Sequence, residues 1–543
     1  MPNAVLDIGH FIFQNCVVFK GNIRIFVQEN QNIMKAYLLS SLVLGIVLMT
    51  SCSKNEEKPQ EIPNTPSAKQ EVQTIAPEAY TLAGDGKTLS TWKDIGATTI
   101  DLSEDKILNK ITAIDKEAFK DNKKITKIVL PATLTHIGEG AFQGCSELTS
   151  VTIASTPNTQ GEALRELFAS TDQHLPLSNQ EEGLTLPEGV ISIGEYAFAY
   201  CGKLKEITLP KGVKQILPNT FSYCNSLEKV TLPQGFTHIG DSTFVGCRRL
   251  KEINFPTSLT YIGKKSFMDT ALTTAILPDN VTEIGELAFC RTSLTTVKLP
   301  KNLKTIEKKV FAFCNSLTSI DIPQGLIDIK EGAFGGCKSL ASIDLPNTIT
   351  HIGKSAFSNC EKLTSIVIPQ GVTEIERYTF LMCSSLTSVE FPQGLKKIGK
   401  LAFSLCEKLP YVTLPDGLQE IDDGAFQALK ELTSIIIPEG ILIINEYTFN
   451  VCSKLESVTL PSTIKEIRQA AFFACNSLNY LTVKAETPPI LLPPVFSASY
   501  VVDDDVEYRK IDSLHIYVPS ASVEAYKKAQ YWSEYDNRIQ TKN

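Results

Sequence analysis

The chain has 543 residues, of which 43% are hydrophobic and 21% charged, and its formal net charge is −8. Lysine and arginine are scattered among aspartate and glutamate rather than gathered into a basic stripe, so the composition excludes nucleic acid as an expected partner. A chain of this length usually divides into several globular domains, but a repeat without Gly/Ser-rich or Pro-rich linkers fills most of this one.

The N-terminal residues carry a targeting signal. Met34 and Lys35 precede a short apolar run that ends in small residues directly before Cys52. This order is typical of a secretory signal, and Met-Thr-Ser-Cys resembles the lipobox of bacterial lipoproteins, which implies lipidation of the Cys52 sulfur. We therefore expect translation to begin at Met34, residues 1–33 to be untranslated, and residues 34–51 to be a lipoprotein signal peptide. A plain signal peptide and a transmembrane anchor are the alternatives, although the apolar run is short for a membrane span.

Residues 52–78 are polar, contain proline and have too few apolar side chains to fold, so we expect a flexible tether. The tether begins with Lys54, Asn55, Glu56 and Glu57, which resemble the acidic export signal of some Gram-negative lipoproteins. The resemblance implies an outer-membrane protein that is held by the lipid on Cys52 and exposed at the cell surface.

A phenylalanine that returns every 22 or 23 residues dominates the rest of the chain. Within each unit, apolar residues such as Leu363, Ile366 and Ile368 have the spacing of the inward positions of a short strand, and Pro369 ends that strand. A unit this short must stack on its neighbours to bury a core, so the period predicts a solenoid. The fifteen copies are centred on Phe119, Phe142, Phe198, Phe221, Phe244, Phe267, Phe289, Phe311, Phe334, Phe357, Phe380, Phe403, Phe426, Phe449 and Phe472.

The second half of each unit predicts a short helix. The isoleucine that comes five residues before each repeat phenylalanine is often followed by glycine, but Asp422, Asn445 or, two positions on, Pro218 follows it in other copies, and these types share a role at helix starts. Proline requires a negative φ, so the glycine is not expected to supply a left-handed turn. We therefore expect about fifteen coils of 22–23 residues, each with one short strand and one short convex helix, which is an α/β leucine-rich repeat solenoid.

The unit LPxGVxxIGxxAFxxCxxLxxI resembles the BspA-like class of leucine-rich repeats over roughly residues 100 to 483. This class is found in bacterial cell-surface proteins that bind host macromolecules or other cells. The resemblance implies a surface lipoprotein whose ligand is a protein or a glycan.

We expect residues 79–118 to form an N-terminal cap and the first coil, residues 119–483 to form the repeats, and residues 484–543 to form a C-terminal cap. An insertion at 154–183 interrupts the repeats. Leu164 and Phe168 lie within it at helical spacing, so a short amphipathic helix is expected there, either as a ligand-contacting lid or as a tolerated decoration.

Neither cysteine nor histidine indicates a reactive site. Eleven cysteines follow the repeat phenylalanine by three residues, and stacked coils would align their Cβ vectors in parallel, so buried free thiols are favoured over disulfides or a metal site. His136, His238 and His351 share one variable repeat position, which predicts solvated side chains. The chain contains no G-x-S-x-G, H-E-x-x-H, P-loop or G-x-G-x-x-G motif. We therefore expect no enzyme activity, no cofactor and no metal.

The outward strand positions are the candidate binding surface, and we expect them to form the concave face. Most are threonine or serine, which are good strand residues and can be scaffold alone. Tyr411 and Tyr480 are the exceptions, and we take them as candidate anchors together with Thr413 and Thr482. The expected function is an adhesin-like, monomeric binding protein; the alternative is a structural or accessory envelope lipoprotein, for example one of a nutrient-handling complex.

Overall fold

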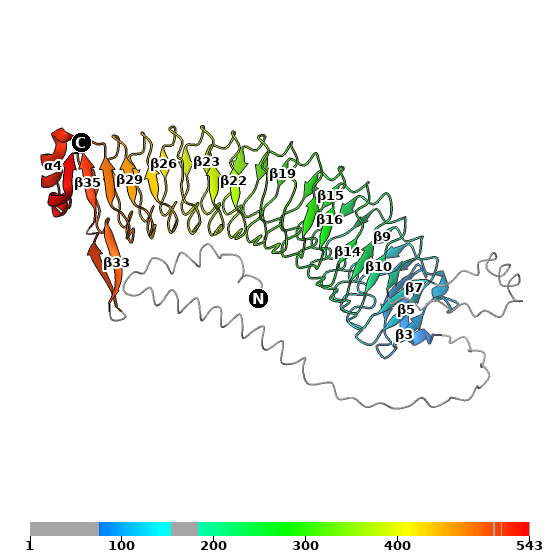
Figure 1. The fold of residues 1–543 in the computed structure, drawn as a ribbon. Helices are drawn as coiled ribbons and strands as arrows, with labels where there is room; N and C mark the ends of the chain where they lie inside the picture. The colour runs from blue at the N-terminus through cyan, green and yellow to red at the C-terminus, as the bar shows by residue number, and fades with distance from the viewer. Residues whose placement is uncertain (1–74, 154–182, 503–504, 512, 542–543) are drawn as a thin grey trace, which may run out of the picture. The chain divides into compact units, whose positions relative to one another are not determined.

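The computed structural model describes residues 75–153, 183–502, 505–511 and 513–541 (Figure 1). The chain divides into two units. Residues 72–499 and 508–543 make up one unit, and its described part is the solenoid that follows. The described residues of the other unit, 500–502 and 505–507, belong to strands β33 (Ser497–Val502) and β34 (Asp505–Lys510), which pair in a two-stranded sheet.

One side of the solenoid is a ladder of parallel strands that repeats once per coil, here called the first ladder. Hydrogen bonding divides it into sheets of seven, two, two and five strands. The strands are β3 (Thr99–Asp101), β5 (Lys127–Leu130), β7 (Ser150–Ile153), β8 (Leu184–Thr185), β10 (Glu206–Thr208), β12 (Lys229–Thr231), β14 (Glu252–Ile253), β16 (Thr274–Ile276), β18 (Thr296–Lys298), β22 (Ser365–Val367), β24 (Ser388–Glu390), β27 (Ser434–Ile436), β29 (Ser457–Leu460), β31 (Tyr480–Val483), β35 (His515–Val518) and β36 (Ile539–Thr541).

A second ladder follows the turn after each first-ladder strand. Apart from β1 and β2, which pair antiparallel, its strands are two residues long and parallel. They are β1 (Tyr80–Leu82), β2 (Thr88–Trp92), β4 (Ala113–Ile114), β6 (His136–Ile137), β9 (Ser192–Ile193), β11 (Gln215–Ile216), β13 (His238–Ile239), β15 (Tyr261–Ile262), β17 (Glu283–Ile284), β19 (Thr305–Ile306), β20 (Asp328–Ile329), β21 (His351–Ile352), β23 (Glu374–Ile375), β25 (Lys397–Ile398), β26 (Glu420–Ile421), β28 (Ile443–Ile444), β30 (Glu466–Ile467) and β32 (Ile490–Leu491).

The third side of each coil is a run of turns, so the expected convex helix is wrong. Around Phe380, the flanking residues Tyr378 and Met382 have φ of 62° and 61°, which no right-handed helix accommodates. The N–H groups of Tyr378, Phe380 and Met382 donate to the next coil at 2.9, 2.8 and 2.9 Å rather than along their own segment. Each coil therefore uses every second N–H to bind its neighbour, a pattern that a helix cannot make.

The solenoid has about 18 turns rather than the expected fifteen or so. Strands outside the phenylalanine repeats extend the ladders at both ends, with β1 and β2 at the start and β35 and β36 at the end. The described part of the chain contains one α-helix, α4 (Val523–Lys528), and four 3₁₀ helices: η1 (Pro77–Ala79), η2 (Leu108–Lys110), η3 (Ser520–Ser522) and η4 (Trp532–Arg538). No helix in this part is long and apolar enough to cross a membrane.

The core is a continuous stack of the repeat phenylalanines. From Phe119 to Phe496, successive ring centroids lie 4.9 to 5.8 Å apart in stacked geometry. Trp92 stacks on Phe119 at one end, and Trp532 packs against Phe496 at the other. Leu363, Ile366 and Ile368 are buried, as predicted, with the other inward strand residues. This core holds the outward strand residues on a fixed backbone.

The last segment is tied to the solenoid by buried aromatic side chains. Tyr526 of α4 donates its hydroxyl to Ala485 O at 2.8 Å, and the indole N–H of Trp532 donates to Pro489 O at 2.7 Å. Both rings are buried, and they meet edge to face at 5.1 Å. The polar atom of each ring is hydrogen-bonded, so the burial of these side chains leaves no donor unpaired.

Candidate functional site: the tyrosine face

The first ladder brings Tyr411 and Tyr480 into one outward row. Tyr411 is bridged to Ser434, which pairs with Ser457, which pairs with Tyr480. The two tyrosines are therefore three coils apart, about 14 Å at a strand spacing of about 4.8 Å. We call the outward strand positions of these four coils the tyrosine face, and its members are Pro410, Tyr411, Thr413, Thr433, Ser434, Ile436, Glu456, Ser457, Thr459, Asn479, Tyr480 and Thr482.

Thr413 and Thr482 belong to a second row, two residues further along each strand. Ile436 pairs with Thr459 and Thr459 with Thr482, and Thr413 holds the same place in the coil of Tyr411. The structure therefore gathers all four of the predicted strand residues on one face. It adds Ile436, which is 67% exposed and was not predicted. A single outward isoleucine among threonines gave too weak a sequence signal.

The two tyrosines differ in their support. Tyr480 is 49% exposed and its ring stacks at 6.0 Å on His515 and at 6.4 Å on Tyr517, both from β35. Tyr411 is 61% exposed. An open groove of about 360 Å³ continues from the Tyr480 end, and it is lined by Thr482, Lys484, Tyr517 and residues of the last turn.

The ladder is interrupted beside Tyr411. In the preceding coils the N–H of Thr387 donates to Thr364 O at 2.8 Å. Pro410 holds the corresponding position and has no N–H, so this bond cannot be repeated. Strand β24 has no partner strand in the coil of Tyr411, and that coil joins the ladder through the bridge of Tyr411 to Ser434.

The hydroxyl groups of the first ladder fall into two classes. In several coils outside the tyrosine face, the first outward threonine donates its hydroxyl to the backbone of the preceding coil, as Thr149, Thr295 and Thr387 do at 2.9 to 3.0 Å. These hydroxyls are scaffold. Within the described residues, the hydroxyls of the tyrosine face make no hydrogen bond to the protein, and they belong to Thr413, Thr433, Ser434, Ser457, Thr459 and Thr482.

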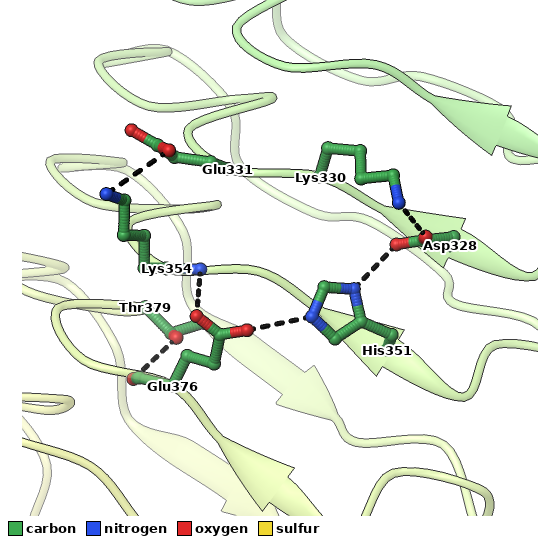
Figure 2. A network of polar contacts seen from close by, with 7 residues as sticks. All are labelled: Asp328, Lys330, Glu331, His351, Lys354, Glu376 and Thr379. Carbon is green, nitrogen blue, oxygen red and sulfur yellow. Dashed lines mark hydrogen bonds and ion pairs between the residues drawn. The ribbon is translucent and has the colours of Figure 1, made fainter.

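The second ladder carries a network of charges centred on His351 (Figure 2). Its Nδ1 lies 2.6 Å from Asp328 Oδ1, and its Nε2 lies 2.8 Å from Glu376 Oε1. Lys330 Nζ contacts the other oxygen of Asp328 at 2.6 Å, and the Lys354 N–H donates to Glu376 Oε2 at 3.0 Å. The side chain of His351 is 46% exposed, so the predicted solvated histidine is confirmed, but carboxylates from the neighbouring coils contact both nitrogens of its ring.

The network shifts the titration of its members. Partial burial lowers the pKa of His351, but hydrogen bonds to Asp328 and Glu376 outweigh it, so the pKa lies above its ordinary value. Partial burial likewise raises the pKa of Asp328, and the bonds from Lys330 and His351 outweigh it and hold this pKa low. A neutral imidazole has one N–H, so only the charged ring donates to both carboxylates. This arrangement joins three coils.

The twelve cysteines of the described residues are buried free thiols, and the predicted burial of the cysteine ladder is confirmed. Each repeat Sγ faces a phenylalanine carbonyl of the preceding coil, as Cys383 does with Phe357 O at 3.2 Å. Burial raises the pKa of Cys383 to about 12, so it is no nucleophile at neutral pH. The structure describes no group of three or more side chains able to hold a metal.

Three predicted site residues lie outside the described residues. Cys52 belongs to residues 1–74, and Leu164 and Phe168 belong to residues 154–182. The proposed lipidation and the insertion contact therefore stay predictions.

The family model for BspA type leucine rich repeat regions matches residues 97–172, 177–295, 282–409 and 373–492 of the chain. The chain belongs to this family. The BspA-type repeat family comprises cell-surface proteins, and no enzyme family is indicated for this member. No curated protein matches this BspA-type protein.

Several solved bacterial structures resemble this BspA-type protein. A leucine-rich repeat protein from Bacteroides ovatus is 26% identical, with 72% of this chain and 93% of that chain covered and a TM-score of 0.40. A leucine rich cell surface protein from Faecalibacterium prausnitzii is 23% identical, with 77% and 95% covered and a TM-score of 0.40. A leucine-rich repeat protein from Eubacterium ventriosum is 19% identical, with 64% and 91% covered and a TM-score of 0.37.

Proposed function

We propose that this protein is a non-catalytic, monomeric binding protein of the cell surface that holds an extended ligand on its tyrosine face. The observation that carries the proposal is the alignment of Tyr411 and Tyr480 in one row, both exposed, with Ser434 and Ser457 between them, whose hydroxyls make no hydrogen bond to the described part of the protein. A ligand that spans both rings contacts four coils at once.

The physical properties of the face favour binding. Aromatic side chains contribute strongly to recognition when they are exposed on a rigid support. The phenylalanine stack fixes the backbone beneath the face, so little conformational entropy is lost when a ligand binds. The ring of Tyr480 is further restricted by its contacts with His515 and Tyr517.

The anchor proposed for this surface protein is a lipid on Cys52, which holds the chain to the outer leaflet of the outer membrane. The support is the sequence of Met34 and Lys35, an apolar run, small residues and then Cys52. The polar residues 52–78 would separate the solenoid from the membrane. A non-permeant reagent outside the cell cannot reach an accessory protein that faces the periplasm. Labelling of intact cells with such a reagent therefore distinguishes a surface binding protein from a periplasmic accessory protein.

The binding role is tested by attachment of producing cells to surfaces coated with serum proteins, mucin or neutral polysaccharides. The test variant combines Tyr411→Ala with Tyr480→Ala. The matched control combines Tyr200→Ala with Tyr223→Ala, because these tyrosines are 50% and 42% exposed on the turn side and stack on each other at 5.1 Å.

We expect the test variant to lose attachment to at least one coating while the control keeps it. Equal attachment of both variants at equal surface amounts would contradict a binding role for the tyrosine face. Thermal unfolding of the two purified variants should match that of the wild type, which separates lost contact from lost structure.

A further inference from the structure

We infer that the ligand of the tyrosine face is a neutral, linear polysaccharide, an inference that rests on the binding role proposed above. Three independent properties of the face point to this class of ligand: its lack of charge, its exposed rings and its free hydroxyl groups.

The tyrosine face is almost uncharged, and Glu456 is the one charged side chain among its members. The first ladder is different elsewhere. In its N-terminal coils, Glu206 pairs with Lys229, and Lys229 with Glu252, so opposite charges alternate along the row. A face without cations offers nothing to an anionic polymer, and the single carboxylate would repel one. A neutral ligand suits it.

The exposed rings suit the apolar faces of sugar rings. Tyrosine presents an apolar body with a polar tip, and a pyranose likewise has a face of C–H groups with hydroxyls at its edge. The coils repeat every 4.8 Å or so, close to the length of one sugar residue in an extended chain. Tyr411 and Tyr480 are therefore spaced to contact sugars three residues apart, and Tyr517 extends the platform by one coil.

The free hydroxyls suit the edges of the same sugars. A hydroxyl both donates and accepts, as sugar hydroxyls do, so rows of Ser434, Ser457, Thr459 and Thr482 can exchange hydrogen bonds along a glycan in either direction. The two carboxylate oxygens of Glu456 can accept further hydrogen bonds, which two neighbouring hydroxyls of a sugar can donate. Thr433 also keeps its hydroxyl free, whereas Thr295 and Thr387, which hold its position in other coils, donate theirs to the backbone.

A peptide is a poorer fit to the same surface. Peptides that bind sheets add a strand at an open edge or insert side chains into pockets. Strands β29 and β31 are each paired on both sides, so no edge is open beneath Tyr480. The described cavity nearest the face is the open groove at its end, not a pocket between the tyrosines.

The test is affinity electrophoresis of the full mature chain in native gels that contain one polysaccharide each. Hydroxyethyl cellulose, galactomannan and yeast mannan are the neutral probes, and heparin is the anionic one. The variants are Tyr411→Ala with Tyr480→Ala, and Ser434→Ala with Ser457→Ala. The control is Thr274→Ala with Thr296→Ala, because these threonines hold the same row on the same ladder several coils away from the two tyrosines.

We expect at least one neutral polysaccharide to retard the wild type and the control equally. The tyrosine variant should bind about tenfold more weakly or worse, since two aromatic contacts are lost, and the serine variant should lie between. The inference is overturned if heparin alone retards the protein or if no probe does. It is also overturned if a neutral polysaccharide retards the wild type and the tyrosine variant equally. If the tyrosine variant nevertheless loses attachment to a protein coating, the binding role stands and only the ligand class is wrong.

Discussion

The rings of Phe357 and Phe380 stack with centroids 5.5 Å apart and planes only 2° apart. Each ring in the middle of the row thus covers one face of the next, and both are fully buried. Removing one ring leaves a cavity bounded by two coils that cannot collapse without breaking their ladders. The stack is therefore the main packing element along the solenoid.

Phe357→Ala should destabilise the coils around it by about 3 to 5 kcal/mol, because a buried aromatic ring is lost and a cavity remains. Amide hydrogen exchange measures this locally, and protection should fall most in the coils of Phe334 and Phe380. Lys362→Ala, an exposed change in the same coil, is the control and should alter protection little. Equal effects of the two changes would show that the inward row is misassigned.

The Cys360 thiol should resist alkylation in the folded protein. It is fully buried, its Sγ faces Phe334 O at 3.4 Å, and burial raises its pKa well above the usual range. Thiolate is the reactive form, so reaction with iodoacetamide at neutral pH should require unfolding. Mass spectrometry of peptides labelled with and without denaturant measures this, and rapid labelling of native Cys360 would contradict its burial.

His351→Gln should destabilise the protein more at about pH 5.5 than at about pH 8.5. The folded pKa of His351 is raised above its ordinary value of 6.5. Its stabilising effect is therefore fully present below the unfolded pKa and is lost as pH rises through the folded pKa. The low pKa of Asp328 keeps that partner ionised throughout this window.

The measurement is the difference in thermal unfolding midpoint between wild type and variant at the two pH values. His136→Gln is the control, because His136 holds the same repeat position but its Nδ1 contacts the Thr135 hydroxyl. A difference that does not change with pH would rule out an ion pair at His351.

Cys52→Ala should abolish lipidation, since acyl chains on this sulfur are the proposed anchor. Mass spectrometry of the N-terminal peptide from membranes should show a modified Cys52 in the wild type, and the variant should leave the membrane fraction. Peptides from residues 1–33 in cells, or an unmodified Cys52, would disprove this processing.

The sequence alone identified the solenoid because the buried phenylalanine cannot vary without opening the core. It did not reveal that the third side of each coil is a run of turns rather than a helix. The position two residues after each phenylalanine is left-handed in every coil described, but bulky residues such as Met382 and Phe313 obscure the pattern. Gly144, Gly336 and Asn359 at this position were the missed signal, since these residue types favour positive φ.

The glycine after the last isoleucine before the repeat phenylalanine was predicted more successfully. It is not left-handed, as expected, and its reason is close packing: a Cβ on Gly263 would lie 2.5 Å from the carbonyl carbon of Gly240 in the preceding coil. The contacts of His351 required the register between coils, because its partners are 23 and 25 residues away. The sequence could not show which hydroxyls of the tyrosine face are free, because a repeat pattern does not reveal which side chains are hydrogen-bonded.

Photo-crosslinking from the tyrosine face of cell-bound protein tests the binding role most directly. A benzophenone side chain at Ser434 lies between the two tyrosines, and one at Gln419 lies in the coil of Tyr411 but just before the second ladder. After cells attach to the coating that the wild type binds, irradiation should give an adduct from position 434 and none from 419. Tyr411→Ala with Tyr480→Ala should remove that adduct. An adduct from position 419 alone, or one from 434 that persists without the tyrosines, would contradict binding at the tyrosine face.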